Sequence, residues 1–278
     1  MTEKLSEIQK RFLNEAVQKK AKVGVGIWRP EPTVVRSVIE ASQYCDLTVV
    51  GTKIDGLNCL ETKDDDQASQ VIVDLLKQGK IQGVVRAQLK DSYTHELFLK
   101  EFKRPKDEFK ISVSFFAKDD QWFVVPSASN YASLSLEAKR QEIFAAAEWL
   151  ESNLGLKPTI AITSTRRPTG RVGEFGLLEE IAERCETVAK ELKEKGYDVK
   201  EYYIEYEKAV WEGRTLICPA IGMIGNTWTK GLVYLGDWTW VSSFYLNQGV
   251  YWNNAPRNNS KFFWPIISTA AWINRGKI

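Results

Sequence analysis

One segment in the second half of the 278-residue chain concentrates groups that bind anions. The apolar run TIAIT is followed by the polar sequence STRRPTGR, and a helical pattern starts a few residues later. The candidate binding residues in this segment are Ser164, Thr165, Arg166, Arg167, Thr169, Gly170 and Arg171. Guanidinium groups pair with phosphate or carboxylate, and the start of a helix offers backbone N–H groups to an anion. The segment therefore predicts an anion socket, with a solvated basic loop as the alternative.

Two later segments have a similar character. In CPAIGMIGNTWTKG (218–231), an apolar run ends at glycines, and Gly225 and Asn226 lie near an expected helix start. In NNAPRNN (253–259), Arg257 occupies a polar stretch between aromatic segments. Because open α/β sheets bind ligands at the carboxyl ends of their strands, we expect the three loops to share one cleft.

The sequence lacks the residue patterns of several other common binding and catalytic sites. The sequence GVGIWR (24–29) has no third glycine for a dinucleotide-binding GxGxxG, so we expect its glycines to serve a tight turn. His95 is the single histidine, and we expect it on a helix surface. The four cysteines, at positions 45, 59, 185 and 218, have no metal-binding spacing and are expected to be reduced and mostly buried. No metal site is predicted.

Composition excludes two classes of partner. The net charge is only +2, whereas a non-specific nucleic-acid binder usually carries a clear basic excess. No apolar run approaches the roughly 20 residues of a membrane span. The N-terminal sequence MTEKLSEIQKRF lacks the apolar core of a signal peptide, so we expect a cytoplasmic protein without a membrane partner.

Short apolar runs alternate with helical patterns along the chain. This alternation predicts an α/β fold with a mostly parallel sheet covered by helices. We place the domain boundary near Gly155–Lys157, with residues 1–155 and the C-terminal helix 261–278 in a first domain and residues 156–260 in a second.

Tryptophan is concentrated late in the sequence. Seven of the ten lie beyond residue 205: Trp211, Trp228, Trp238, Trp240, Trp252, Trp264 and Trp272. Such a cluster is typical of a stacking platform, of a homodimer interface or of a wide aromatic core. We expect Trp228, Trp238, Trp240 and Trp252 to surround the three polar loops.

The order of these segments resembles the phosphate acetyl/butyryltransferase superfamily and, more closely, its methyltransferase-related MtxX family of methanogens. The resemblance runs over nearly the full length, through VGVGI, LLKQGKIQGVVRAQL, the 164–171 loop, the Pro219–Asn226 segment and NNAPRNN. It implies a two-domain α/β/α sandwich of phosphotransacetylase-like (isopropylmalate dehydrogenase-like) type with an inter-domain cleft. It also assigns catalytic roles to Arg257 and Asn226, and a substrate contact to Arg86.

The resemblance implies a transferase that acts on a small phosphate- or carboxylate-bearing molecule in methanogenic methyl or acyl metabolism. Pro256 stands where phosphate acyltransferases have a serine beside the arginine, so coenzyme A is disfavoured as a cofactor. Two alternatives remain open at this point. One is a non-catalytic binding or assembly protein that retains the fold, and the other is a methyltransferase.

Overall fold

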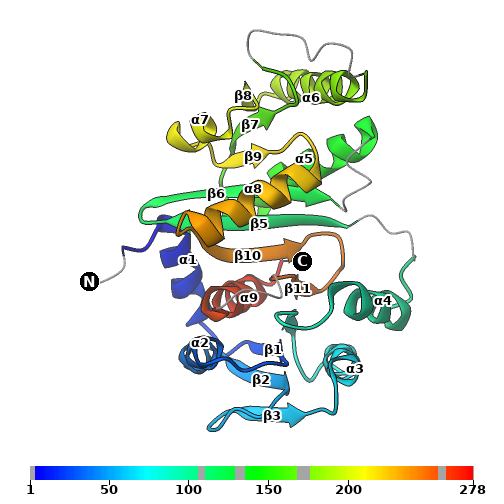
Figure 1. Ribbon diagram of the computed structural model, residues 1–278. Helices are drawn as coiled ribbons and strands as arrows, with labels where there is room; N and C mark the ends of the chain where they lie inside the picture. The colour runs from blue at the N-terminus through cyan, green and yellow to red at the C-terminus, as the bar shows by residue number, and fades with distance from the viewer. Residues whose placement is uncertain (1–3, 106–109, 129–134, 168–175, 256–260, 278) are drawn as a thin grey trace. The chain divides into compact units, whose positions relative to one another are not determined.

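The computed structural model describes residues 4–105, 110–128, 135–167, 176–255 and 261–277, and its internal contacts divide the chain into two compact units. Unit 1 comprises Met1–Glu7 and Phe109–Thr239, and unit 2 comprises Ile8–Glu108 and Trp240–Ile278. Figure 1 shows unit 1 mainly in green and yellow, and unit 2 in blue, cyan, orange and red.

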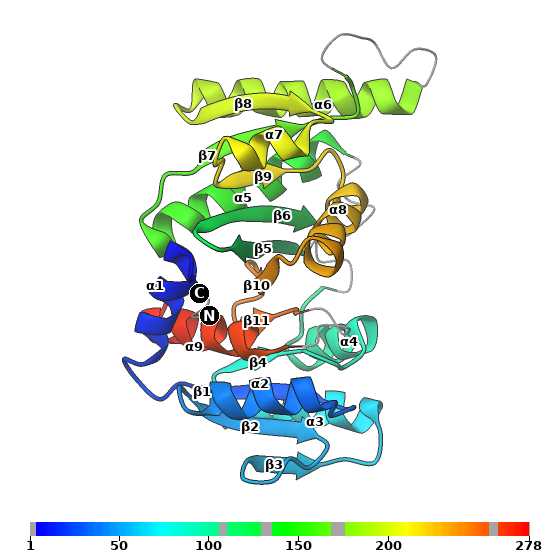
Figure 2. The same cartoon turned by 60° about the vertical axis from the view of Figure 1, so that its left-hand side comes forward.

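Unit 2 is a sheet with helices on both faces. Its strands follow the order β3-β2-β1-β4-β11-β10. Their bounds are β1 Lys22–Ile27, β2 Asp46–Gly51, β3 Asn58–Glu61, β4 Gly83–Val85, β10 Thr239–Tyr245 and β11 Tyr251–Asn253. The described pairs are parallel except β10–β11, which is antiparallel. The helices are α1 Glu7–Ala16, α2 Pro32–Ser42, α3 Asp65–Lys77, α4 Asp91–Glu101 and α9 Phe263–Arg275. Helices α2 and α9 cover one face, and α3 and α4 cover the other (Figures 1 and 2).

Unit 1 has the same layered architecture, with strand order β5-β6-β9-β7-β8. The strands are β5 Ile111–Lys118, β6 Gln121–Ala128, β7 Thr159–Thr163, β8 Asp198–Tyr203 and β9 Leu216–Cys218. The β5–β6 hairpin is antiparallel, and the other described pairs are parallel. The helices are α5 Leu136–Leu154, α6 Gly176–Glu194, α7 Tyr206–Trp211 and α8 Gly222–Leu235. Helices α5 and α6 cover one face of this sheet, and α7 and α8 cover the other (Figure 2).

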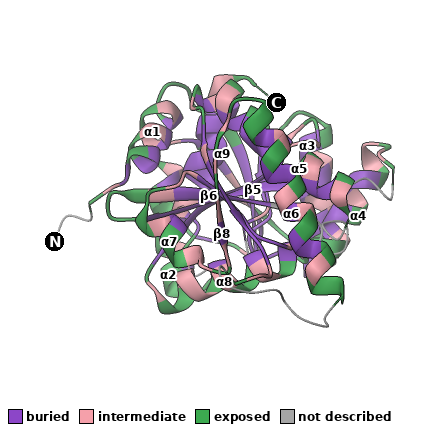
Figure 3. Cartoon of the chain, turned by 90° about the horizontal axis from the view of Figure 1, so that it is seen from above, coloured by how far each residue is buried: buried purple, intermediate pink, exposed green. Residues whose placement is uncertain are grey.

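Local sequence explains where these elements form. The central strands are apolar runs buried on both faces, as expected for parallel strands under two helical layers, and Figure 3 shows them as buried. The Ser135 side chain caps α5 by accepting a hydrogen bond from the backbone N–H of Ala138, and Gly155 ends the helix at a φ of 62°. The predicted α/β class with a mostly parallel sheet is confirmed.

Three strands do not follow from the alternation of apolar runs and helical patterns in the sequence: β3, β10 and β11. The compact units also divide the chain at places other than residue 155. Strand β6 pairs with β9, and α5 packs on α6, so residues 110–155 lie in unit 1 with the loops that follow them. Helix α9 lies in unit 2, beside β4 and β1.

The glycines of GVGIWR do not form the tight turn that we expected. Gly24 and Gly26 lie inside β1, and a Cβ atom added to Gly24 would lie 2.5 Å from Ile81 Cδ1. A side chain at Gly26 would meet Leu89. These glycines therefore allow close packing on the strand rather than a change of chain direction.

Candidate functional site

The predicted anion socket begins at one edge of the unit 1 sheet, where β7, β8 and β9 end. Thr163 Oγ1 donates a hydrogen bond to the Cys218 carbonyl at 3.0 Å, which joins the end of β7 to the end of β9. The Ser164 N–H donates to the Tyr203 carbonyl at the end of β8, at 2.7 Å. The polar residues after β7 therefore start beside the segment that leads from β9 into α8.

The structure gives the first residues of this loop specific partners. Arg166 lies between two carboxylates of α6, and its guanidinium donates to both Glu179 and Glu186. The hydrogen bond to Glu179 is the main reason that the pKa of Arg166 is raised. Thr165 Oγ1 donates to the Leu178 carbonyl at 2.5 Å. Arg166 and Thr165 therefore hold the loop against α6, whereas Arg167 is exposed.

The start of α8 forms the other side of this edge. Its N-cap residue, Ile221, provides no side-chain cap to the first turn. Gly225 is buried against Pro219, and a Cβ added to it would lie 2.5 Å from Pro219 Cγ. Asn226 is exposed on the same helix. Gly225 thus sets how closely α8 approaches the end of β9, and Asn226 offers an amide to solvent.

A buried polar cluster supports this edge from within unit 1. Lys139 of α5 is 1% exposed; its Nζ donates to the Pro219 carbonyl and lies 3.5 Å from Glu142 Oε1. Burial lowers the pKa of Lys139, but Glu142 together with Cys185, Cys218 and Tyr206 more than offsets this effect, so the pKa lies above its ordinary value. The Tyr206 hydroxyl is buried beside Thr163 and Ala220. The lysine therefore fixes the backbone from which α8 departs.

Cys218 is the last residue of β9 and therefore lies at the edge where the candidate site begins. It is fully buried, and burial raises the pKa of its thiol well above the ordinary value. Because the thiolate is the nucleophilic form, Cys218 is a structural residue and not an activated nucleophile. Cys45 and Cys185 are also buried and Cys59 is partly so, and all four thiols are free, which confirms the expectation for the cysteines.

Sequence reasoning missed Lys139 and Glu142, although a signal was present. In LEAKRQEIFAAAEWL these residues fall on the apolar stripe that also carries Ile143, Ala146 and Leu150. A lysine and a glutamate three residues apart on an otherwise apolar face indicate a buried ion pair.

One predicted site residue, Arg86, lies in the other unit. Arg86 belongs to unit 2 and is buried, and its guanidinium donates to Asn254 Oδ1 and to the carbonyls of Leu89 and Ala255. This bonding joins the end of β4 to the segment after β11. The residues outside the described part of the chain are Thr169, Gly170, Arg171 and Arg257.

Two expectations about aromatic and histidine side chains were wrong. His95 is 2% exposed and packs between Phe98 and Tyr245, because its face of α4 is turned to the core of unit 2. Trp252 is 1% exposed and contacts Phe98, and Trp240 donates to the Ser242 carbonyl at 3.0 Å from a buried position. These two tryptophans belong to an aromatic core of unit 2, so their rings do not line an open cleft.

Across the described ranges, no three His, Cys, Asp or Glu side chains are grouped to hold a metal ion. No helix within those ranges has the length and apolar character needed to cross a membrane.

The chain is similar in sequence to a known protein. No family model matches the chain. It is 27% identical over 222 residues to a protein of Methanosarcina mazei described as "Putative methyltransferase mtx subunit X", covering 78% of each chain. The similarity in sequence extends over most of both chains.

Solved structures with low sequence identity share the fold of this chain. A branched-chain phosphotransacylase from Enterococcus faecalis V583 matches 91% of this chain and 98% of its own, with a TM-score of 0.62 and 12% identity. The EutD phosphotransacetylase from Staphylococcus aureus matches 96% and 98%, with a TM-score of 0.57 and 14% identity. A 4-hydroxythreonine-4-phosphate dehydrogenase from Burkholderia phymatum matches 91% and 99%, with a TM-score of 0.52 and 14% identity. The fold is therefore that of the phosphotransacylases, as the sequence resemblance implied.

Proposed function

We propose that this protein is a transferase that binds a small phosphate- or carboxylate-bearing substrate at the edge where β7 and β9 end. The observation that carries the proposal is the Thr163–Cys218 hydrogen bond, which joins the strand end that precedes the arginine-rich segment to the strand end that precedes α8. A helix N-terminus and nearby guanidinium groups together attract an anion. The relationship to mtx subunit X supports a place in methanogenic methyl or acyl metabolism.

The charge at this edge limits which residues can bind the substrate. Arg166 is already neutralised by Glu179 and Glu186, so we assign it to holding the loop. Arg167 and Arg171 then supply the charge that binds the anion, and Asn226 orients the transferred group. By the family resemblance, Arg257 stabilises the charge that develops in the transition state. Arg86 is occupied with backbone carbonyls, so a substrate contact from it requires a rearrangement.

Isothermal titration calorimetry with inorganic phosphate and with acetyl phosphate tests this proposal. Arg167→Ala removes a charged donor, so we expect it to weaken binding by about 1.5–3 kcal/mol. Lys190→Ala is the control for a lost cation, because Lys190 is exposed near the end of α6 and pairs with Glu194. Equal affinity in both variants, or no binding of either ligand to the wild-type protein, would contradict the proposed anion site.

A non-catalytic assembly protein is the first alternative. The relative's name describes a subunit, and α8 exposes Met223, Tyr234 and Leu235, the last at 89%. Apolar residues exposed together are typical of an interaction surface, and a homodimer through the tryptophan-rich half is one form it could take. Sedimentation equilibrium of the purified chain distinguishes a dimer from a monomer.

Methyl transfer is the second alternative, and it is supported by the name of the relative. A methyltransferase that uses a small anionic methyl donor would still require the same loop. Loss of phosphate binding in Arg167→Ala with no effect on methyl transfer would separate the two activities.

A further inference from the structure

Unit 1 contains a pocket at the ends of the strands opposite to the candidate site. It has a volume of about 490 Å³ and lies between α7, α8 and the turn that joins β5 to β6. Strand β6 starts at this turn and runs parallel to β9, so the pocket lies toward the amino ends of these strands. Its size is within the range of small-molecule sites, roughly 300–1,000 Å³.

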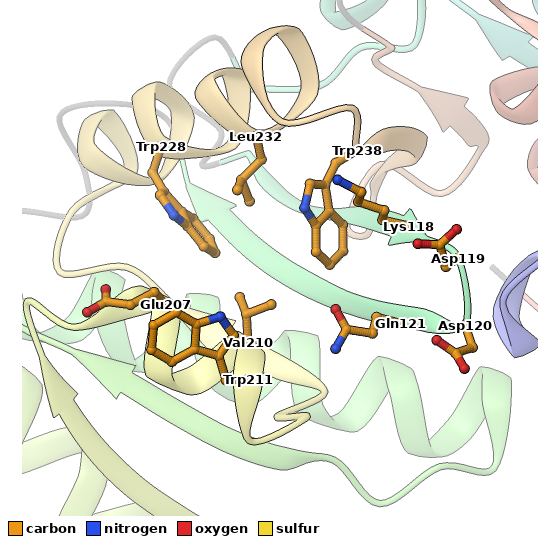
Figure 4. A pocket seen from close by; sticks show the side chains of 10 residues that line it. All are labelled: Lys118, Asp119, Asp120, Gln121, Glu207, Val210, Trp211, Trp228, Leu232 and Trp238. Atoms are coloured by element: carbon orange, nitrogen blue, oxygen red, sulfur yellow. The ribbon is translucent and has the colours of Figure 1, made fainter.

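Three indole rings form the walls of the pocket. Figure 4 shows Trp228 and Trp238 on the side of α8, with Trp211 of α7 facing them across open space. Trp228 and Trp238 are supported from behind, because Phe123 lies 5.4 Å and 4.9 Å from their ring centroids. Trp211 is 73% exposed, an unusual position for a side chain with so much apolar surface. Two fixed rings and one exposed ring therefore face the same space.

Carboxylates lie at both ends of the pocket. Glu207 lies beside Trp211, and Asp119 and Asp120 lie at the far end (Figure 4). Asp120 pairs with Lys4 at 2.6 Å, whereas Glu207 forms no ion pair with any described residue. The one cationic residue of the lining, Lys118, directs its ammonium group to the Gly236 carbonyl at 2.8 Å. The lining is therefore acidic, the opposite of what a phosphate or carboxylate ligand requires.

From these observations we propose that the Trp211–Trp228–Trp238 pocket binds an organic ammonium cation. The faces of indole rings attract cations, and an alkylated ammonium gains from them without losing strong hydration. Glu207 adds a charge that a neutral aromatic or sugar ligand would not use. This site goes beyond the proposed transferase function and does not depend on it, since it shares no residue with the anion loop.

The test compares two ligands of nearly the same shape. Choline and its neutral isostere 3,3-dimethylbutanol are titrated into the full-length protein and followed by calorimetry or ligand-observed NMR. We expect choline to bind and the isostere to bind at least about tenfold more weakly. Tetramethylammonium, which has no hydroxyl group, is expected to compete with choline.

Two variants locate the site. Trp211→Ala removes an exposed ring, and Glu207→Gln removes a charge without changing shape; each is expected to weaken choline binding by about three- to tenfold. Glu183→Gln, an exposed carboxylate on α6, is the control for lost charge and should leave the affinity unchanged. Equal binding of the neutral isostere, unchanged affinity in both pocket variants, or no binding of either cation would each overturn the proposal.

Discussion

Lys139 and Glu142 place two charges in the interior of unit 1, where water does not reach them. Removing one member of a buried pair leaves the other charge uncompensated, which costs about 3–5 kcal/mol, whereas replacing both by apolar residues is often nearly neutral. We therefore expect Lys139→Met to lower the free energy of unfolding by about 3–5 kcal/mol. The double variant Lys139→Met/Glu142→Leu should recover most of this loss. Urea unfolding of both variants measures the difference.

Equal destabilisation in the single and double variants would show that the contact with Pro219, and not the ion pair, determines the effect. Lys139 Nζ also donates to that carbonyl, so a change at Glu142 is needed to separate the ion pair from the Pro219 hydrogen bond. Arg166 shows in a similar way that residue type alone does not determine the role of a side chain. Arg166 has the chemistry of an anion ligand, yet two carboxylates thirteen and twenty residues later in the chain occupy it.

Helix α8 contains two glycines in very different surroundings. A Cβ at Gly225 would lie 2.5 Å from Pro219 Cγ, whereas a Cβ at Gly231 meets nothing within 4 Å. We expect Gly225→Ala to destabilise the protein by about 1–3 kcal/mol through overpacking. Gly231→Ala should stabilise it by about 0.5–1 kcal/mol through helix propensity. Thermal unfolding of the two variants checks the signs, and a stabilising Gly225→Ala would mean that α8 can shift away from β9.

At the scale of elements, prediction succeeded where an apolar run or an amphipathic repeat was long. The run TIAIT predicted β7, and the helical pattern that follows STRRPTGR predicted α6, whose buried face carries Ile181, Cys185, Val188 and Leu192. Strands β10 and β11 were missed because their polar and aromatic sequences carry no β alternation, and Asn253 is buried through bonds to Ser242, Pro265 and Thr269. Hydrogen bonds of a buried side chain depend on tertiary contacts, which the spacing of apolar residues in the sequence does not predict.

For the whole molecule, the fold is shared with phosphotransacylases, but the residues do not favour their reaction. The resemblance to the phosphate acyltransferases puts Pro256 where they have a serine, and Arg166 is neutralised by α6. Trp240 and Trp252, two of the tryptophans that we expected around the polar loops, are core residues and do not bear on this reaction. We still expect thioester formation from acetyl phosphate and coenzyme A to be slower than about 1 per second. A spectrophotometric assay at that rate or faster would identify a working phosphotransacylase.

The location of a bound phosphate tests the central claim most directly. Crystals grown with phosphate should show the ion at the edge where β7 and β9 end, within hydrogen-bonding distance of Arg167 and of first-turn amides of α8. A protein that binds phosphate in solution but holds it only at other positions, with the Arg167 guanidinium directed into bulk solvent, would contradict the assignment of this edge as the substrate site.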